Sequence, residues 1–290
     1  MNKPLIGEPC ALCQVGRSSK GGEHVLPTWL LDMWPARFGP FTLHRNGESV
    51  LARDGNVRPQ TSAARFKLPM CPSCNGELDR RFEKPAKQLI RRIFNSDGVL
   101  DPPEAEIVGL WFVKTWLLLA HPEVRVSDPG FDPKPWVPPE QHHYEWMITG
   151  MAPPPGLSAW LVKLDRTVQA PATRHIALPK VITDGKTVRF RSFQFGLSWL
   201  DVSLVYRPNW TIDHPLEGEH RAARLWPPSG GNGLDVGTLP FVPEREMAWL
   251  KGPTIHLQPN VYGKMEIPAL SPSTDFLSDL GPNFIQVLKW

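Results

Sequence analysis

The sequence predicts an α+β protein in which a small metal-stabilised domain is followed by a helix and a β-rich region. Three observations lead to this prediction. All four cysteines fall in two CxxC pairs, Cys10/Cys13 and Cys71/Cys74. Residues 104–120 predict a helix that is apolar on most of its faces. From Ala159 onward, apolar and polar residues alternate with the period of two that is typical of strands.

The composition indicates a folded chain with short elements. Of the 290 residues, 41% are hydrophobic, which is enough for a packed core and argues against disorder. The 33 prolines and 12 tryptophans favour many turns and a β-rich part over long helices. No apolar run reaches membrane-spanning length, and nothing at the start resembles a signal peptide. We therefore expect a cytoplasmic protein without a membrane partner.

The net charge of +3 is unevenly distributed along the chain. Residues 1–99 contain 15 Lys/Arg against 9 Asp/Glu, a net charge of +6. The remainder contains 17 against 20, a net charge of −3. A basic first part suits a polyanionic partner such as nucleic acid, although zinc-bound thiolates would reduce the excess.

The two CxxC pairs have the spacing of ligands to a structural Zn²⁺ ion. Two residues between the thiolates allow one tight turn to direct both sulfurs at the same metal. A disulfide framework fits less well, because no secretory signal precedes the cysteines. We expect one zinc ion with four thiolate ligands, which are Cys10, Cys13, Cys71 and Cys74.

Short elements are predicted between the two pairs. Residues 23–27 predict a first strand, and residues 28–40 a short amphipathic helix. Two alternating runs on either side of Asn46-Gly47 predict a hairpin, because this dipeptide favours the tight turn that joins antiparallel strands. Residues 65–70 predict a second strand that leads into the second cysteine pair.

A helix over residues 76–95 is expected next, with a kink or break at Pro85. Asn75, Asp79 and Glu83 are spaced by four residues and should share one face of it. The rest of its surface is basic, which suits contact with a phosphate backbone. A solvated helix with i,i+4 ion pairs is an equally good interpretation.

The proline-rich segments indicate the boundaries between the predicted domains. We predict a first domain over residues 1–99, a helix and Pro-rich linker over 100–156, and a β-rich accessory domain over 157–290. The helix at 104–120 should be a buried spine, and His142-His143 should lie in a structural loop. The predicted strands of the accessory part are 160–164, 174–181, 187–195 and 197–206.

The order CxxC, Glu23-His24, CxxC and Asn75 resembles that of the zinc-containing HNH endonucleases, also called ββα-metal or His-Me finger nucleases. It is similar to the recombination endonuclease VII branch in particular. The resemblance covers about the first third of the chain. It implies a treble-clef ββα-metal domain that hydrolyses nucleic-acid phosphodiester bonds, DNA in preference to RNA. By analogy, restriction or phage defence would be its setting.

The resemblance also implies roles for three residues. His24 would act as general base, and Glu23 and Asn75 would bind a catalytic Mg²⁺ or Mn²⁺ ion. Carboxylate and amide oxygens are suitable ligands for such a hard cation. One departure is that Glu, where the family has Asp, precedes the His, which lengthens the reach to the metal by one methylene.

Plainer interpretations remain open for the same residues. Asn75 suits the N-cap of the following helix, and His24 suits an ordinary surface position. A non-catalytic zinc-ribbon adaptor that binds nucleic acid or protein would need the cysteines but not Glu23-His24 and Asn75 in this order. The accessory half as a ligand sensor, and a homodimeric assembly, are further open alternatives.

Overall fold

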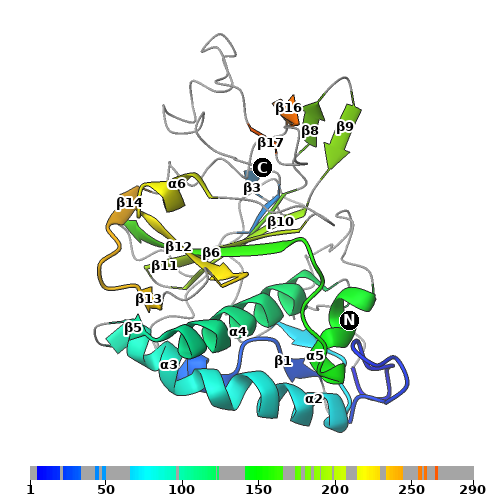
Figure 1. Ribbon diagram of the computed structural model, residues 1–290. Coiled ribbons are helices and arrows are strands. Elements are labelled where there is room, and N and C mark those ends of the chain that lie inside the picture. Colours follow the sequence, from blue (N-terminus) through cyan, green and yellow to red (C-terminus); the bar gives the residue numbers. More distant parts are fainter. Residues whose placement is uncertain are drawn as a thin grey trace.

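The computed structural model describes residues 5–19, 22–33, 43–45, 48–49, 66–95, 98–121, 123, 141–165, 174–177, 180–183, 186–189, 191–197, 199–206, 214–228, 233–243, 254–256, 258–259 and 265–266. Helices and a large sheet form two stacked layers, with the long helix α4 (Pro102–Ala120) between the N-terminal elements and the sheet (Figure 1). The α+β class predicted from the sequence is confirmed. In the described part of the chain, no helix is both long enough and apolar enough to span a bilayer.

The N-terminal elements are short. Strand β1 (Glu23–His24) is antiparallel to β4 (Lys67–Leu68), and helix α1 (Thr28–Asp32) follows β1 closely. Helix α2 (Pro72–Leu78) begins directly after Cys71, the first cysteine of the second pair. The two predicted strands are therefore present, each with two residues.

One continuous helical rod follows the second cysteine pair. Helix α2 runs through a π-helical turn, η3 (Asp79–Glu83), into α3 (Lys84–Asn95). The backbone N–H of Lys84 bonds to the carbonyl of Asp79, five residues back. Pro85 would leave a carbonyl unpaired and clash with it in a regular α-helix, and the wider π turn immediately precedes this position. The expected irregularity is thus a π turn and not a break.

Helix α4 is the buried spine that the sequence predicts. A capping box begins it: the Asp101 carboxylate accepts from the Glu104 N–H (2.9 Å), and the Glu104 carboxylate accepts from the Asp101 N–H (3.1 Å). Its middle is apolar on most faces, with Trp111 and Trp116 almost fully buried. The helix can therefore pack against α3 on one side and the sheet on the other.

The described part of the large sheet has eight strands, in the order β12-β6-β11-β10-β7-β2-β3, with β14 parallel to β6. Their bounds are β2 Leu43–Arg45, β3 Glu48–Ser49, β6 Leu157–Asp165, β7 Arg174–Ala177, β10 Arg191–Leu197, β11 Leu200–Tyr206, β12 Ala222–Trp226 and β14 Phe241–Pro243. The predicted hairpin is confirmed, because His44 pairs with Ser49 and Arg45 with Glu48. Its strand β2 also pairs in parallel with β7, so this hairpin extends the sheet.

Smaller pairs complete the described strands. Strands β8 (Lys180–Thr183), β9 (Lys186–Arg189) and β15 (Thr254–His256) form one sheet. Strand β5 (Val99–Leu100) pairs with β13 (Leu234–Asp235), and β16 (Gln258–Pro259) with β17 (Met265–Glu266).

The central strands β6 and β11 are buried on both faces. Leu161 and Val202 are cross-strand partners in the core that contains α4. Val162 lies on the opposite face, with Leu216 of the short helix α6 (Pro215–Gly218) in a second cluster. Strands covered on both sides are nearly continuous in hydrophobicity, which is why β6 alternates poorly.

The predicted Pro-rich linker contains a packed helix. Helix α5 (His142–Thr149) contacts α2, and its Tyr144, Trp146 and Met147 are buried. The expected loop at His142-His143 is therefore wrong, because both residues begin this helix and His143 is buried. One core cluster runs from Cys10 to Leu239 across the boundaries of the predicted domains, and the division into domains stays a prediction.

Candidate metal centre

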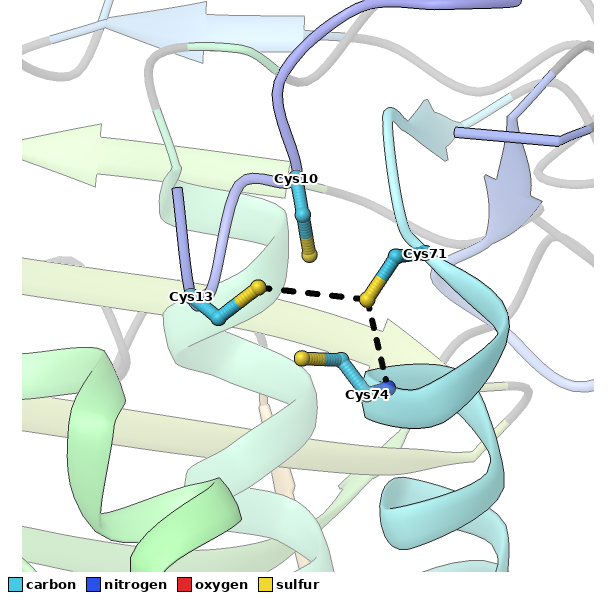
Figure 2. Close-up of side chains that lie close together, drawn as sticks. All are labelled: Cys10, Cys13, Cys71 and Cys74. Carbon is cyan, nitrogen blue, oxygen red and sulfur yellow. Dashed lines mark hydrogen bonds between the residues drawn. The ribbon is translucent and has the colours of Figure 1, made fainter. Parts of the chain in front are cut away.

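The four cysteine sulfurs converge between the first cysteine pair and the start of α2 (Figure 2). The sulfurs lie within 4.8 Å of one another, and those of Cys13 and Cys71 are 3.9 Å apart. A tetrahedral site with Zn–S bonds of about 2.3 Å separates its sulfurs by about 3.8 Å. All four residues are free thiols. The cluster therefore fits a four-coordinate structural metal ion such as zinc.

The first pair is shaped by a tight turn. The Cys10 N–H donates to the Gly16 carbonyl (2.8 Å), and the Gln14 N–H donates to the Cys10 carbonyl (2.9 Å). Gln14 has a φ of 58°, in the left-handed region. The Gly16 N–H then donates to the Cys13 sulfur at 3.3 Å. A backbone donor aimed at sulfur stabilises the thiolate that a metal requires.

The second pair uses the start of a helix. Cys71 is the N-cap of α2, Pro72 occupies its first turn, and the Cys74 N–H donates to the Cys71 sulfur at 3.5 Å. The N-terminal end of a helix carries partial positive charge and favours a thiolate. The two pairs are joined directly, because the Ala11 N–H donates to the Pro69 carbonyl at 2.8 Å.

Gly16 is required by the close approach of its backbone to the cluster. A Cβ atom at this position would lie 2.7 Å from both the Cβ and the sulfur of Cys71. Real Cβ atoms do not approach other atoms so closely, and the obstacle is a metal ligand. Only glycine allows the turn to close over the second cysteine pair.

The thiols differ in acidity. Burial raises the pKa of Cys10 and of Cys74, and neighbouring cysteines raise that of Cys74 further. Burial also opposes ionisation of Cys13, but the N–H groups of Gly16 and Val15, together with hydrogen bonds to Cys74 and Cys10, outweigh it and lower its pKa to about 7. Four thiolates so close together need a cation to offset their repulsion. Metal binding must therefore release protons and weaken in acid.

Two polar side chains from later in the chain support the first cysteine pair. His121 Nε2 donates to the Ala11 carbonyl (3.2 Å), because its Nδ1 accepts from the Glu123 N–H (3.0 Å). Gln141 Nε2 donates to the Leu12 carbonyl at 2.6 Å. Burial lowers the pKa of His121 to about 4, although its bond to Ala11 opposes the shift. Neither His121 nor Gln141 was predicted from the sequence, because neither belongs to a recognisable motif.

The predicted catalytic residues lie on the elements next to the cluster. Glu23 and His24 form β1, where they are opposite Leu68 and Lys67, respectively. Asn75 is half-buried in the first turn of α2, and its N–H bonds to the Cys71 carbonyl. The N-cap role considered for Asn75 is wrong, because Cys71 occupies that position. Convergence of Glu23, His24 and Asn75 around one cavity stays a prediction.

The surroundings of His24 favour the neutral form of its imidazole ring. The residue is largely exposed, yet partial burial of its ring lowers its pKa below the ordinary value of 6.5. The positive charge of Lys67 lowers it further, and the charge of Glu23 opposes both effects. At pH 7 the ring is therefore mostly unprotonated and able to accept a proton.

The predicted stripe of Asn75, Asp79 and Glu83 does not persist along one face. The π turn changes the helical phase between these residues. Asp79 remains half-exposed and pairs with Lys84 at 2.8 Å. Glu83 instead turns inward and forms an ion pair with Lys114 of α4, whose side chain is 1% exposed.

The basic residues of the α2–α3 rod are largely paired. Arg80 bonds to Glu77 (2.6 Å), Arg92 pairs with Glu104, and Arg81 donates to the Trp146 and Met147 carbonyls of α5 (2.8 Å each). Lys87 and Arg91, one turn apart on α3, have no acidic partner within the described ranges. The interpretation as a solvated helix with i,i+4 ion pairs is thus correct only in part, because Arg81 and Arg92 bind to neighbouring elements.

Comparison of the chain with protein-family models, with curated proteins and with solved structures finds no match.

Proposed function

We propose that this protein is a metal-dependent endonuclease of the HNH type that hydrolyses phosphodiester bonds, in DNA in preference to RNA. One observation carries the proposal. The four-cysteine cluster joins the strand pair β1/β4 to the start of α2 within one small unit. These elements carry Glu23, His24 and Asn75 in the order strand, strand, helix, which the resemblance requires.

His24 is the proposed general base. A neutral imidazole can take a proton from water as the water oxygen bonds to phosphorus and the ester P–O bond breaks. The lowered pKa of His24 keeps the ring neutral at pH 7. Lys67, opposite it in β4, adds a positive charge where a phosphate anion would approach.

Glu23 and Asn75 are the proposed ligands of a catalytic Mg²⁺ or Mn²⁺ ion. Both are half-buried and offer oxygen atoms, the donors that such hard cations prefer. A bound cation would stabilise negative charge on the phosphate and on the leaving oxygen. The cysteine cluster would hold a separate zinc ion with a structural role, since four thiolates leave no open coordination position.

A non-catalytic adaptor is the second candidate. It is favoured by the ion pairing on the α2–α3 rod, which leaves little unpaired positive charge there for a phosphate backbone. In that case the cysteine cluster would be a scaffold for binding nucleic acid or protein, and the ion pairing favours a protein partner.

Cleavage by the His24→Ala variant separates the two candidates. The purified parent should cut plasmid DNA in the presence of Mg²⁺ or Mn²⁺, and RNA is tested in parallel. Addition of EDTA should stop the cleavage. His24→Ala should lose about 10²–10⁴ in rate, the usual contribution of a general base. It should keep its zinc and its fold. His220→Asn is the control, because it removes an exposed imidazole elsewhere with a residue that tolerates the positive φ of this position. A parent that cuts nothing would favour the adaptor, and undiminished cutting by His24→Ala would show that the cysteine-centred unit is only a scaffold.

A further inference from the structure

The partly buried carboxylate of Glu83 links three helical elements. Its Oε2 accepts from Trp29 Nε1 of α1 (3.2 Å) and from Trp111 Nε1 of α4 (3.0 Å). Its Oε1 pairs with the Lys114 ammonium group of α4. The Glu83 side chain is 13% exposed. Two indoles and one ammonium group thus donate to a single acid at the end of the π turn.

A buried ion pair needs an explanation other than stability. Removing two charges from water costs several kcal/mol per ion, and apolar replacements are often neutral or stabilising. The Glu83–Lys114 pair alone would only connect η3 to α4, which already pack against each other. The other carboxylate oxygen of Glu83 adds a contact to a third element, because it accepts from Trp29 on the short helix α1.

Helix α1 cannot hold itself in place. It has five residues, and Pro27 at its N-cap provides no side-chain bond. An isolated helix of this length is unstable in water, so tertiary contacts must fix it. Those contacts include the buried Leu30 and the Trp29 ring, which lies 5.8 Å from Trp111 between centroids. Only three residues separate α1 from His24.

We propose that Glu83 is a positioning residue of the candidate site. Through Trp29 it holds α1, and with it the strand that carries Glu23 and His24, against the helix that carries Asn75. This link is independent of the metal cluster, and it tethers the strand side of the site to the helix side. The inference rests on the proposed function, which assigns Glu23, His24 and Asn75 their roles in catalysis.

The two indoles provide a matched pair of variants. Trp29→Phe and Trp111→Phe each remove one donor to the same oxygen while keeping an aromatic ring. Trp111 is fully buried and Trp29 is half-buried, so Trp111→Phe should cost more stability. Only Trp29 lies on α1. Trp29→Phe should therefore reduce kcat by about tenfold to a hundredfold with little change in KM, as misplaced catalytic groups do. Trp111→Phe keeps an aromatic ring against Trp29 and should reduce kcat much less than Trp29→Phe does.

A second pair of variants isolates the acceptor. Glu83→Gln with Lys114→Met removes both charges but keeps a carbonyl oxygen for Trp29. Glu83→Met with Lys114→Met removes that acceptor as well. The two double variants have similar volume and no buried charge, so both should fold. Only the second should lose activity as Trp29→Phe does, and its Trp29 indole N–H should shift in the NMR spectrum.

The imidazole signals of His24 provide a readout that needs no cleavage. Their chemical shifts should change in Trp29→Phe and in the Glu83→Met, Lys114→Met variant. They should remain unchanged in Trp111→Phe and in the Glu83→Gln, Lys114→Met variant. If the parent cuts nothing while this pattern holds, the proposed function fails but the positioning link stands. If the His24 signals and kcat instead follow the ranking of stability, with Trp111→Phe affected most, Glu83 is only a structural residue and the inference is overturned.

Discussion

The metal-centre region and the α4–sheet region are stabilised in different ways. Around the cysteines, two strands of two residues and a helix of five residues form few backbone hydrogen bonds, although Leu30 and Leu68 are buried. In the other region, β6 and β11 pair over seven residues and pack on a helix of 19 residues. We therefore expect the first region to depend on a metal ion in addition to packing, and the second to depend on the hydrophobic effect.

The two regions are nevertheless in contact. His121 at the end of α4 and Gln141 before α5 donate to carbonyls of the first cysteine pair. The same core cluster contains Cys10 and Leu161. Perturbing one region should therefore affect the other to a degree that experiments can measure.

Removing the metal should have the largest effect. Structural zinc contributes on the order of 10 kcal/mol in small zinc domains, because an unfolded chain does not offer a formed site. Cys71→Ser, or prolonged chelation, should unfold β1, β4 and the start of α2 while β6 and β11 keep their amide protection. Hydrogen exchange followed by mass spectrometry would measure both regions together.

Elemental analysis should find one zinc per chain in the parent. A Ser73→Ala variant is the matched control, since Ser73 lies between the same two ligands and is exposed. A parent without bound metal, or a fully protected Cys71→Ser variant, would show that packing alone holds the first region.

Acid should act on both regions, with a smaller effect. The folded pKa values of His121 and His214, about 4 and 3, lie below the ordinary value of 6.5, mainly because both rings are buried. Neutral His121 and His214 therefore stabilise the fold above pH 6.5, and this contribution is lost as pH falls towards these folded values. The loss is on the order of 3 to 5 kcal/mol for each residue.

Conservative variants would assign the acid effect to its region. His214 is the N-cap of α6, accepting from the Leu216 N–H at 3.1 Å, and Asn would keep that cap without titrating. His121→Gln keeps an N–H donor for the Ala11 carbonyl. Denaturant unfolding between pH 4 and 7 should depend less on pH in each variant. An unchanged slope in both would mean that other groups cause the acid sensitivity.

Glycine substitutions should have the smallest effects, with opposite signs. Gly16→Ala would place its Cβ 2.7 Å from Cys71, which should cost about 1–3 kcal/mol and speed metal loss. Gly76→Ala in α2 meets no atom within 4 Å and should stabilise the helix by about 0.5–1 kcal/mol. Thermal melts and zinc release to a chelator would measure the two effects. Faster zinc release from Gly76→Ala than from Gly16→Ala would contradict this account of the cluster.

Sequence patterns predicted the local features because short-range chemistry decides them. CxxC spacing, the Asn46-Gly47 dipeptide and the largely apolar sequence of α4 each express a local preference for a turn, a hairpin or a helix. The meeting of Cys10 with Cys71 was also predictable, since a shared metal explains both pairs. The roles of Glu23, His24 and Asn75 came from the resemblance and stay predictions.

Tertiary structure alone decided which distant groups meet. Glu83 carries the same helical spacing as Asn75 and Asp79, but the π turn and the buried Lys114 direct it inward. Strand β2 joins the sheet beside β7, and His121 reaches the Ala11 carbonyl. No periodicity encodes these contacts, because they depend on how separate elements pack and on which buried polar groups then need partners.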